Sequence, residues 1–386
     1  MRKAHWHSIA LLTIAFVTLA APVSAAGADK KDPIADLQKQ INQLRQRVDS
    51  LSGRVATVEG QLSPASYSVT CPGGSISAAL AAASTAAPVR ISIQGTCVEE
   101  VVISRDDVTL QGGGTDPTIT APAGAGSAIR IDGVQGVVLR GLVLTGGTFT
   151  LSVNKGATFT AYNLKISGAQ GSGLYIQNGT SAYLEDSEIA HNQGGGADAS
   201  FGSSLTLANS QVIDNGRSGL FVQGSVATLW GTNVARNEIG VYVRNGRVGM
   251  FPGWPPTDYA ILDNSNTGAV LEASHLFMDS GRVAGNGQAI TAGWGSVAQL
   301  SNAAIEGNGS GVSAYGGSVV KLEGAGVIHG GSGPGISLWD TSTAGGGGTL
   351  TVTGSPHGIW CAGPPSVAQL HRPLPGVTTN CPAPSQ

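Results

Sequence analysis

The order of hydrophobic and polar residues along this chain repeats at a short, nearly constant interval. In most copies a hydrophobic residue is followed three positions later by Asn, then by Gly and a short segment in which apolar and polar residues alternate. A fixed short period over most of a chain is typical of repeat architectures. The leading hydrophobic residues stand at 144, 166, 189, 212, 234, 261, 283, 305 and 327, at steps of 22, 23, 23, 22, 27, 22, 22 and 22.

Each repeat is predicted to contain two or three short strands joined by Gly and Asn turns. The segment after the Asn alternates with a period of two, as at 220–222 and 241–243, and another strand precedes it, as at 205–207. Repeats this short stack as coils whose parallel strands lie about 4.8 Å apart. The pattern predicts an all-β solenoid, a parallel β-helix of about a dozen coils of 22–23 residues over 88–355. A conventional β-sandwich does not explain the constant step.

With these repeats the chain resembles the right-handed parallel β-helix proteins of the pectate-lyase-like superfold. The resemblance covers roughly residues 88–355 and rests on the period, the Asn positions and the alternation. It implies a fold rather than a reaction. The compact acidic Ca²⁺ sites of such lyases, the paired Asp motifs of polygalacturonases and the Asp-Pro-His-Asp signature of alginate epimerases are not found. We therefore transfer no catalytic residue and predict no metal and no cofactor.

The repeated Asn residues are expected to form a structural ladder. Stacked amides can donate and accept hydrogen bonds from coil to coil. The predicted members are Asn192, Asn215, Asn237, Asn264, Asn286 and Asn308.

A different period precedes the repeats. Between Pro33 and Pro64, hydrophobic residues alternate at steps of three and four, which is the seam of a coiled coil. We predict an oligomerising stalk over 32–63. The segment Arg54–Glu59 matches the pattern of short trimeric coiled coils and favours a homotrimer; the alternatives are a dimer and a lone helix packed on the following domain. The seam is Ile34, Leu37, Ile41, Leu44, Val48, Leu51, Val55, Val58 and Leu62.

The two ends of the chain carry export and capping signals. Residues 1–25 read as a signal peptide with basic residues, a short apolar run and a small-residue cleavage site, and the alternative is a membrane anchor. We expect export to the periplasm or cell exterior and no membrane span after cleavage. Segment 66–87 is predicted to be an N-terminal cap with a short helix, and 356–386 a C-terminal cap or tail.

Four cysteines in an exported chain predict disulfides. They fall into two local pairs, so the simplest of three connectivities joins Cys71 to Cys97 and Cys361 to Cys381. The balance of 21 Lys and Arg against 24 Asp and Glu provides no basic field for nucleic acid.

Scarce aromatic residues indicate a possible binding face. Outward positions of successive strands after the Asn should form columns, and two of these columns combine aromatic rings with polar groups. Such a face suits sugar rings, although ordinary strand preferences would also explain it. The candidate ligand-binding residues in the columns are Tyr175, Asp198, Phe221, Tyr242, Arg244, Glu272, Tyr315 and Trp339.

The longest step in the repeat accommodates a stiff, aromatic loop over 249–259. We expect this loop to flank Tyr242 and to contribute Trp254 and Tyr259 to ligand binding, with packing on a neighbouring protomer as the alternative.

A charged column precedes the ladder. Asp214, Arg236 and Asp263 stand on successive coils and are weak catalytic candidates. Because Arg236 lies between two carboxylates, a structural charge ladder that pairs it with both is the favoured interpretation.

Three functions remain open on this sequence. The favoured one is an exported oligomer that binds polysaccharide or surface glycan. The alternatives are a polysaccharide lyase or glycoside hydrolase with an unrecognised site, and a purely structural or adhesive trimer.

Overall fold

The computed structural model describes residues 43–52, 64–84, 87–114, 117–254, 259–349, 351–354, 357–362, 366–370 and 377–381. The chain divides into two compact units, Met1–Gly60 and Gln61–Gln386. The predicted signal peptide, 1–25, lies outside the described residues. In the first unit, residues 43–52 form an α-helix with all side chains exposed. The rest of the predicted coiled coil, 32–63, lies outside the described residues, and the coiled coil stays a prediction.

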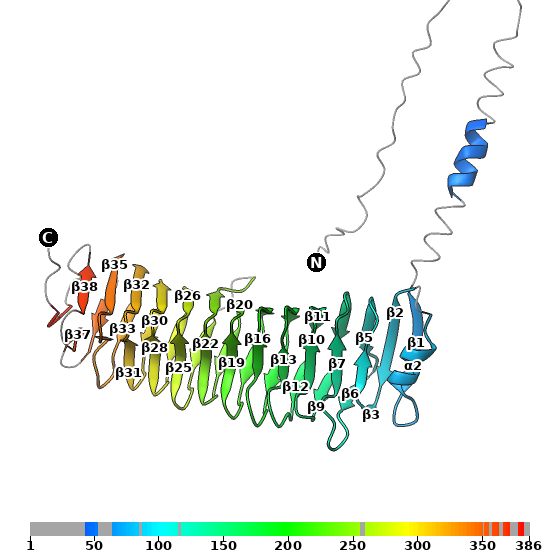
Figure 1. Ribbon diagram of the computed structural model, residues 1–386, viewed down its shortest axis with the longest axis horizontal. Coiled ribbons are helices and arrows are strands. Elements are labelled where there is room, and N and C mark those ends of the chain that lie inside the picture. The colour runs from blue at the N-terminus through cyan, green and yellow to red at the C-terminus, as the bar shows by residue number, and fades with distance from the viewer. Residues whose placement is uncertain are drawn as a thin grey trace, which may run out of the picture. The chain divides into compact units, whose positions relative to one another are not determined.

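The second unit consists of three parallel sheets whose strands follow one another coil by coil (Figure 1). Sheet A contains β1 (Ala65–Thr70), β2 (Val89–Gln94), β5 (Val108–Gly112), β8 (Val137–Arg140), β11 (Thr158–Tyr162), β14 (Ser181–Glu185), β17 (Ser204–Ala208), β20 (Val226–Trp230), β23 (Arg247–Phe251), β26 (His275–Asp279), β29 (Val297–Ser301), β32 (Val319–Gly324), β35 (Thr343–Gly348) and β38 (Val367–Leu370). Sheet B contains β3 (Thr96–Val98), β6 (Thr118–Thr120), β9 (Val143–Thr145), β12 (Lys165–Ser167), β15 (Glu188–Ala190), β18 (Gln211–Ile213), β21 (Asn233–Ala235), β24 (Ala260–Leu262), β27 (Arg282–Ala284), β30 (Ala304–Glu306), β33 (Val327–His329) and β36 (Thr351–Thr353). Sheet C contains β4 (Val101–Ile103), β7 (Ile129–Asp132), β10 (Leu151–Asn154), β13 (Leu174–Ile176), β16 (Ala197–Ser200), β19 (Ser218–Gln223), β22 (Ile239–Arg244), β25 (Thr267–Glu272), β28 (Gln288–Gly293), β31 (Ser310–Ala314), β34 (Ile336–Leu338) and β37 (Ile359–Cys361).

Each coil passes through the sheets in the order A, B, C, which makes a parallel β-helix of about 12 turns. The strands extend beyond the predicted limits of 88–355. β1 lies in the segment predicted as a cap and pairs in parallel with β2 over six residues. At the other end, β37 and β38 continue sheets C and A into the segment predicted as a C-terminal tail. Both segments therefore contribute strands to the solenoid.

The core lies between the three sheets and follows from the period-two alternation of each strand. In one coil, Leu205 and Leu207 of sheet A, Val212 of sheet B, and Leu220 and Val222 of sheet C are all fully buried. Because successive side chains of a strand point to opposite faces, the residues between them face outward. The parallel register then aligns equivalent outward residues of successive coils.

The predicted Asn ladder is present at the corner between sheets B and C, and its six members are buried. The Asn215 side-chain amide donates to Oδ1 of Asn237 at 3.0 Å and to the carbonyl of Ile213 at 3.0 Å. Its own Oδ1 accepts hydrogen bonds from the backbone N–H and Nδ2 of Asn192. The donors and the acceptor of the Asn215 amide are therefore satisfied by a carbonyl of its own coil and by the Asn residues of the two adjacent coils.

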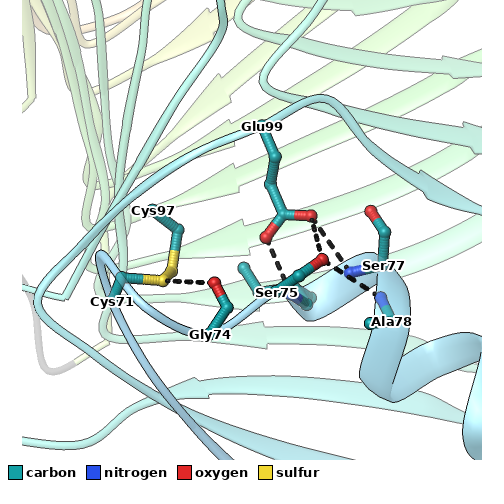
Figure 2. Close-up of a disulfide and its surroundings, with 8 residues drawn as sticks. Cys71, Gly74, Ser75, Ser77, Ala78, Cys97 and Glu99 are labelled. Atoms are coloured by element: carbon teal, nitrogen blue, oxygen red, sulfur yellow. Dashed lines mark hydrogen bonds between the residues drawn. A yellow bond between two sulfur atoms is a disulfide. The ribbon is translucent and has the colours of Figure 1, made fainter.

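The first coils are closed by the short helix α2 (Ile76–Ala82), which buries Ile76. The Glu99 carboxylate accepts hydrogen bonds from the backbone N–H groups of Ile76 at 2.7 Å and Ser77 at 3.1 Å (Figure 2). Burial alone would raise the pKa of Glu99, but these hydrogen bonds outweigh it and lower the pKa. The ionised Glu99 thereby holds the N-terminus of α2 against the open end of the solenoid.

Both predicted disulfides are confirmed. Cys71 is bonded to Cys97, with 5.1 Å between their Cα atoms, beside the Glu99 contact (Figure 2). Cys361 is bonded to Cys381, with a Cα–Cα distance of 5.0 Å. One disulfide therefore lies near each end of the stacked coils and joins a terminal segment to the coils.

The ladder makes a quantitative prediction about stability. We expect Asn215→Leu to lower the free energy of unfolding by at least about 3 kcal/mol, because it leaves several buried partners without a hydrogen bond. Asn233→Leu is the matched control, because Asn233 is half-buried on the outer face of β21, and we expect it to change stability by less than about 1 kcal/mol. Chemical denaturation followed by circular dichroism measures both, and equal effects would contradict the structural role of the ladder.

Candidate functional site

The predicted outward column on sheet C is present in the structure. Tyr175 is paired in register with Asp198, Asp198 with Phe221, and Phe221 with Tyr242. The neighbouring column places Arg244 beside Glu272. Tyr315 and Trp339 directly follow β31 and β34. Sheet C therefore carries the aromatic and polar face that the sequence indicated.

A cavity of about 640 Å³ lies over this face, next to the turns that lead into sheet C. Its volume is in the range of sites that bind small molecules or parts of larger ligands. It is lined by Phe149, Gly171, Ser172, Gly194, Gly195, Asp198, Arg217, Ser218, Phe221, Glu238, Ile239 and Tyr242.

The cavity exists because side chains are missing on two adjacent coils. Backbone hydrogen bonds join Gly171 to Gly194, Gly194 to Arg217, and Arg217 to Glu238, so these residues occupy equivalent positions. A Cβ atom on Gly194 would lie 2.7 Å from the carbonyl oxygen of Gly171, which requires glycine there. Two glycines thus leave a hollow, and Arg217 and Glu238, both exposed, border it on the following coils.

Asp198 is an acid of this cavity whose pKa is raised. Burial raises the pKa of Asp198 to about 6, although a hydrogen bond from the Ser200 hydroxyl, 2.5 Å from Oδ1, lowers it. Its neighbours in the column are Tyr175 and Phe221, so neither adjacent coil places a second carboxylate in register with it. The arrangement provides a hydrogen-bonding acid among aromatic rings rather than a pair of facing carboxylates.

At the other end of the cavity, Tyr242 belongs to a polar group of three side chains. Arg244 donates a hydrogen bond to the Tyr242 hydroxyl at 2.8 Å and is ion-paired with Glu272 at 2.7 Å. Burial and a hydrogen bond with Glu272 raise the pKa of Tyr242. The Phe221 and Tyr242 rings pack edge to face, with centroids 5.2 Å apart. These contacts fix the orientation of Tyr242 beside the cavity.

The aromatic loop over 249–259 does not flank Tyr242, as the sequence suggested. It joins β23 of sheet A to β24 of sheet B, whereas Tyr242 stands on β22 of sheet C. Trp254 is 87% exposed at that other corner. Residues 255–258 lie outside the described part of the chain.

The expectation that Tyr259 contacts a ligand is also wrong. Tyr259 is only 2% exposed, and its hydroxyl is hydrogen-bonded to the carbonyl oxygens of Met250 and Asp279. A phenol that fills the corner of the core and satisfies two backbone carbonyls has a structural role.

The weak catalytic candidates lie outside the cavity. Asp214, Arg236 and Asp263 each adopt a positive φ in the turn between sheets B and C, next to the Asn ladder. Arg236 binds both carboxylate oxygens of Asp214, at 2.8 and 2.7 Å. This hydrogen bonding lowers the pKa of Asp214. Among the described residues Arg236 forms an ion pair with Asp214 and none with Asp263, so the charge ladder that was expected to pair it with both carboxylates is present only in part.

Sequence reasoning did not identify Phe149, Arg217 and Glu238 as cavity residues. All three precede the alternating strands of sheet C. The available signal was Gly194 in a run of three glycines after Asn192, at the place where the next two coils carry the charged residues Arg217 and Glu238.

In the described ranges, no group of three or more His, Cys, Asp or Glu side chains is arranged to hold a metal ion. The helices of those ranges include none that is long and apolar enough to span a membrane.

Comparison with known families supports the architecture. Residues 127–252 match the model of the right-handed β-helix region. No curated protein matches the chain. Together with the sheet topology, the family match describes the chain as an all-β, right-handed parallel β-helix.

Several solved structures are similar in fold at low sequence identity. Pectate lyase Pel9A is 13% identical, with 73% of this chain and 78% of that chain covered and a TM-score of 0.48. The A-module of mannuronan C-5 epimerase AlgE4 of Azotobacter vinelandii is 16% identical, with coverages of 80% and 95% and a TM-score of 0.46. DFA-IIIase of Arthrobacter chlorophenolicus A6 is 14% identical, with coverages of 80% and 94% and a TM-score of 0.41.

The raised pKa of Asp198 predicts a pH dependence of stability. The unfolded carboxyl ionises with a pKa near 3.8 and the folded one near 6, so the folded state retains a proton that the unfolded state loses between these values. The wild type should therefore lose up to about 3 kcal/mol of stability from this group as pH rises from 4 to 7. Asp198→Asn should remove that loss.

Thermal unfolding by circular dichroism between pH 4 and 8 measures this difference. Asp263→Asn is the control for charge removal, because Asp263 is exposed and lies outside the cavity. Parallel pH profiles for Asp198→Asn and the wild type would show that Asp198 is not the buried acid.

Proposed function

We propose that the chain binds a polysaccharide or surface glycan in the cavity on sheet C. The observation that carries this proposal is the cavity of about 640 Å³, in which aromatic rings stand beside Asp198, Arg217 and Glu238. Sugar rings present apolar C–H faces that pack on aromatic rings, and their hydroxyls exchange hydrogen bonds with carboxylates and guanidinium groups. The cavity offers both kinds of contact within one concave surface.

Binding is favoured over catalysis by the placement of the carboxylates. Asp198 and Glu238 are on coils two steps apart, about 9.6 Å along the axis at the spacing of parallel strands. Glu238 is also offset along the strand, because it stands four residues before Tyr242, the residue that shares the column of Asp198. The backbone positions of these two acids are therefore more than about 9.6 Å apart, whereas the carboxyl groups of a glycosidase pair lie about 5 to 9.5 Å apart.

We further propose that the mature protein is exported and trimeric. Two disulfides support an oxidising compartment. In the described helix, the predicted seam residues Leu44, Val48 and Leu51 are 58, 58 and 55% exposed. Their spacing of four and three residues forms one apolar stripe, which identical stripes on two other chains would bury. A trimer would present three cavities and raise the apparent affinity for a polymer.

The binding proposal predicts the effect of removing one ring. Tyr242→Ala should weaken binding to a polysaccharide identified by glycan-array screening about tenfold, because it removes a stacking surface. Tyr242→Phe keeps the ring and should bind to within about threefold of the wild type. Phe277→Ala removes a half-buried ring from sheet A and serves as the control for nonspecific effects.

Affinity gel electrophoresis and titration calorimetry provide the measurements, with circular dichroism to establish that each variant is folded. Wild-type affinity in Tyr242→Ala would contradict the site. A loss of similar size in Phe277→Ala would locate binding on sheet A instead.

The trimer proposal is tested by sedimentation equilibrium of the chain without residues 1–25. We expect a trimer, and we expect monomers after deletion of 32–63 or after the double substitution Leu44→Glu and Leu51→Glu. The substituted chain keeps its full length. If it is a monomer, the cause is therefore the loss of the apolar seam and not the loss of residues. A deletion variant that remains trimeric would place the interface on the β-helix.

A further inference from the structure

Aromatic pairs occur on the strands of sheet C and in the turns directly beside them, far beyond the cavity. Each pair joins rings of adjacent coils, and the pairs are spread over nine coil steps from β10 to β37, about 43 Å at 4.8 Å per step. The pairs are Phe149 with Tyr175, Phe221 with Tyr242, Trp294 with Tyr315, and Trp339 with Trp360, at centroid distances of 4.3, 5.2, 5.2 and 4.9 Å. We call these pairs the aromatic track.

The rings of this track adopt two kinds of arrangement, and its first pair, Phe149 with Tyr175, is stacked at 11°. Three of its pairs are edge-to-face, with interplanar angles of 63, 78 and 80°. Two ring planes that differ by such angles cannot both be perpendicular to the solenoid axis. At least one ring of each of these pairs is therefore inclined toward the direction of the axis. On sheet A, Trp230 and Phe251 are stacked at 23°, whereas Phe251 with Phe277 and Tyr162 with Tyr183 are tilted at 41 and 60°. Rings turned toward the axis offer faces to a ligand that runs along it.

The track is continuous between its second and third pairs. A Cβ atom on Gly293 would overlap the ring of Tyr315, so the ring lies over that glycine, whose partner in the register is Glu272. Glu272 is ion-paired with Arg244, which is hydrogen-bonded to Tyr242. The column of Arg244, Glu272 and Gly293 thus connects the cavity to Tyr315 through polar groups, while Val270 is the outward apolar residue paired with Tyr242 in the other column.

The charges along the track do not suit a polyanion. The cavity presents Asp198 and Glu238 with Arg217. The second arginine, Arg244, is already bound by Glu272. Two cations therefore face three carboxylates, so a polyanion would gain no net attraction and a polycation would gain at most the attraction of one excess carboxylate.

We propose that the ligand is a neutral linear polysaccharide that lies along the solenoid axis and contacts several pairs of the aromatic track at once. This inference rests on the proposed binding at the cavity and extends it to ligand class, direction and length. A chain held at several pairs binds more tightly than a short oligosaccharide held at one, because later contacts form intramolecularly.

The test compares polymers and short sugars. The folded protein is run through native gels containing β-glucan, xylan or galactomannan as neutral polymers, polygalacturonate or alginate as polyanions, and chitosan as a polycation. We expect retardation by at least one neutral polymer and no retardation by the charged ones. For the retarding polymer, the matching disaccharide should bind at least about a hundredfold more weakly in titration calorimetry.

Variants separate the track from the cavity. The double substitution Tyr315→Ala and Trp360→Ala should reduce polymer affinity about tenfold more than disaccharide affinity. The double substitution Tyr315→Phe and Trp360→Tyr keeps both positions aromatic. It should retain polymer binding, because the proposed contact is made by the ring faces. Phe277→Ala on sheet A is again the control.

Each remaining outcome decides one proposal. Wild-type polymer affinity in the double Ala variant, with loss in Tyr242→Ala, overturns the track and leaves the cavity intact. Retardation only by polygalacturonate, alginate or chitosan overturns the neutral class. Wild-type binding in both the double variant and Tyr242→Ala overturns the proposed function itself.

Discussion

The hydrogen-bonded Asn ladder fixes the phase of the coils through the middle of this solenoid. Each ladder Asn is buried and bonded to the Asn of an adjacent coil, so a coil cannot slip by one residue without leaving several buried polar groups unsatisfied. A slip by one residue would also turn the inward side chains outward. The long step of 27 residues shows how the chain keeps this phase. Its extra residues fall in the sequence between β23 of sheet A and β24 of sheet B, and Asn264, which follows them, still accepts a hydrogen bond from Asn237 in the ladder.

Because the coils stack in a fixed register, the residues at equivalent positions of successive coils determine the shape of the surface. Gly171 and Gly194 on two coils, followed by Arg217 and Glu238 on the next two, form a hollow with a charged border only because the coils stack in register. The same register aligns Tyr175, Asp198, Phe221 and Tyr242. The burial that raises the pKa of Asp198 is therefore a property of stacked coils, since its aromatic neighbours come from the coils before and after it.

Much of this arrangement could be predicted from sequence, because a period of two and a constant repeat length together determine which residues share a column. The Asn ladder and the order of the sheet C column follow from that logic, and the pairing of both disulfides follows from the position of the four Cys residues in two local pairs. The cavity does not, because it forms in turns without alternation, where glycines are as typical of ordinary turns as of a binding site. Tyr259 and Trp254 show a second reason for error. Both belong to one aromatic loop, yet the former is buried against two carbonyl oxygens and the latter is exposed, a difference that depends on the folded corner.

Stacking along the axis and binding along the axis compete for the same ring faces. On sheet A, the Trp230 and Phe251 rings stack nearly parallel. This contact stabilises the solenoid but covers the ring faces on which a sugar would pack. On sheet C, edge-to-face packing stabilises neighbouring coils while keeping one ring of each pair turned away from its partner. Gly293 contributes to this difference, since a side chain there would displace the ring of Tyr315. The proposed recognition on sheet C therefore rests on its three edge-to-face pairs together with the cavity beside them, and not on the number of aromatic residues, which both sheets have.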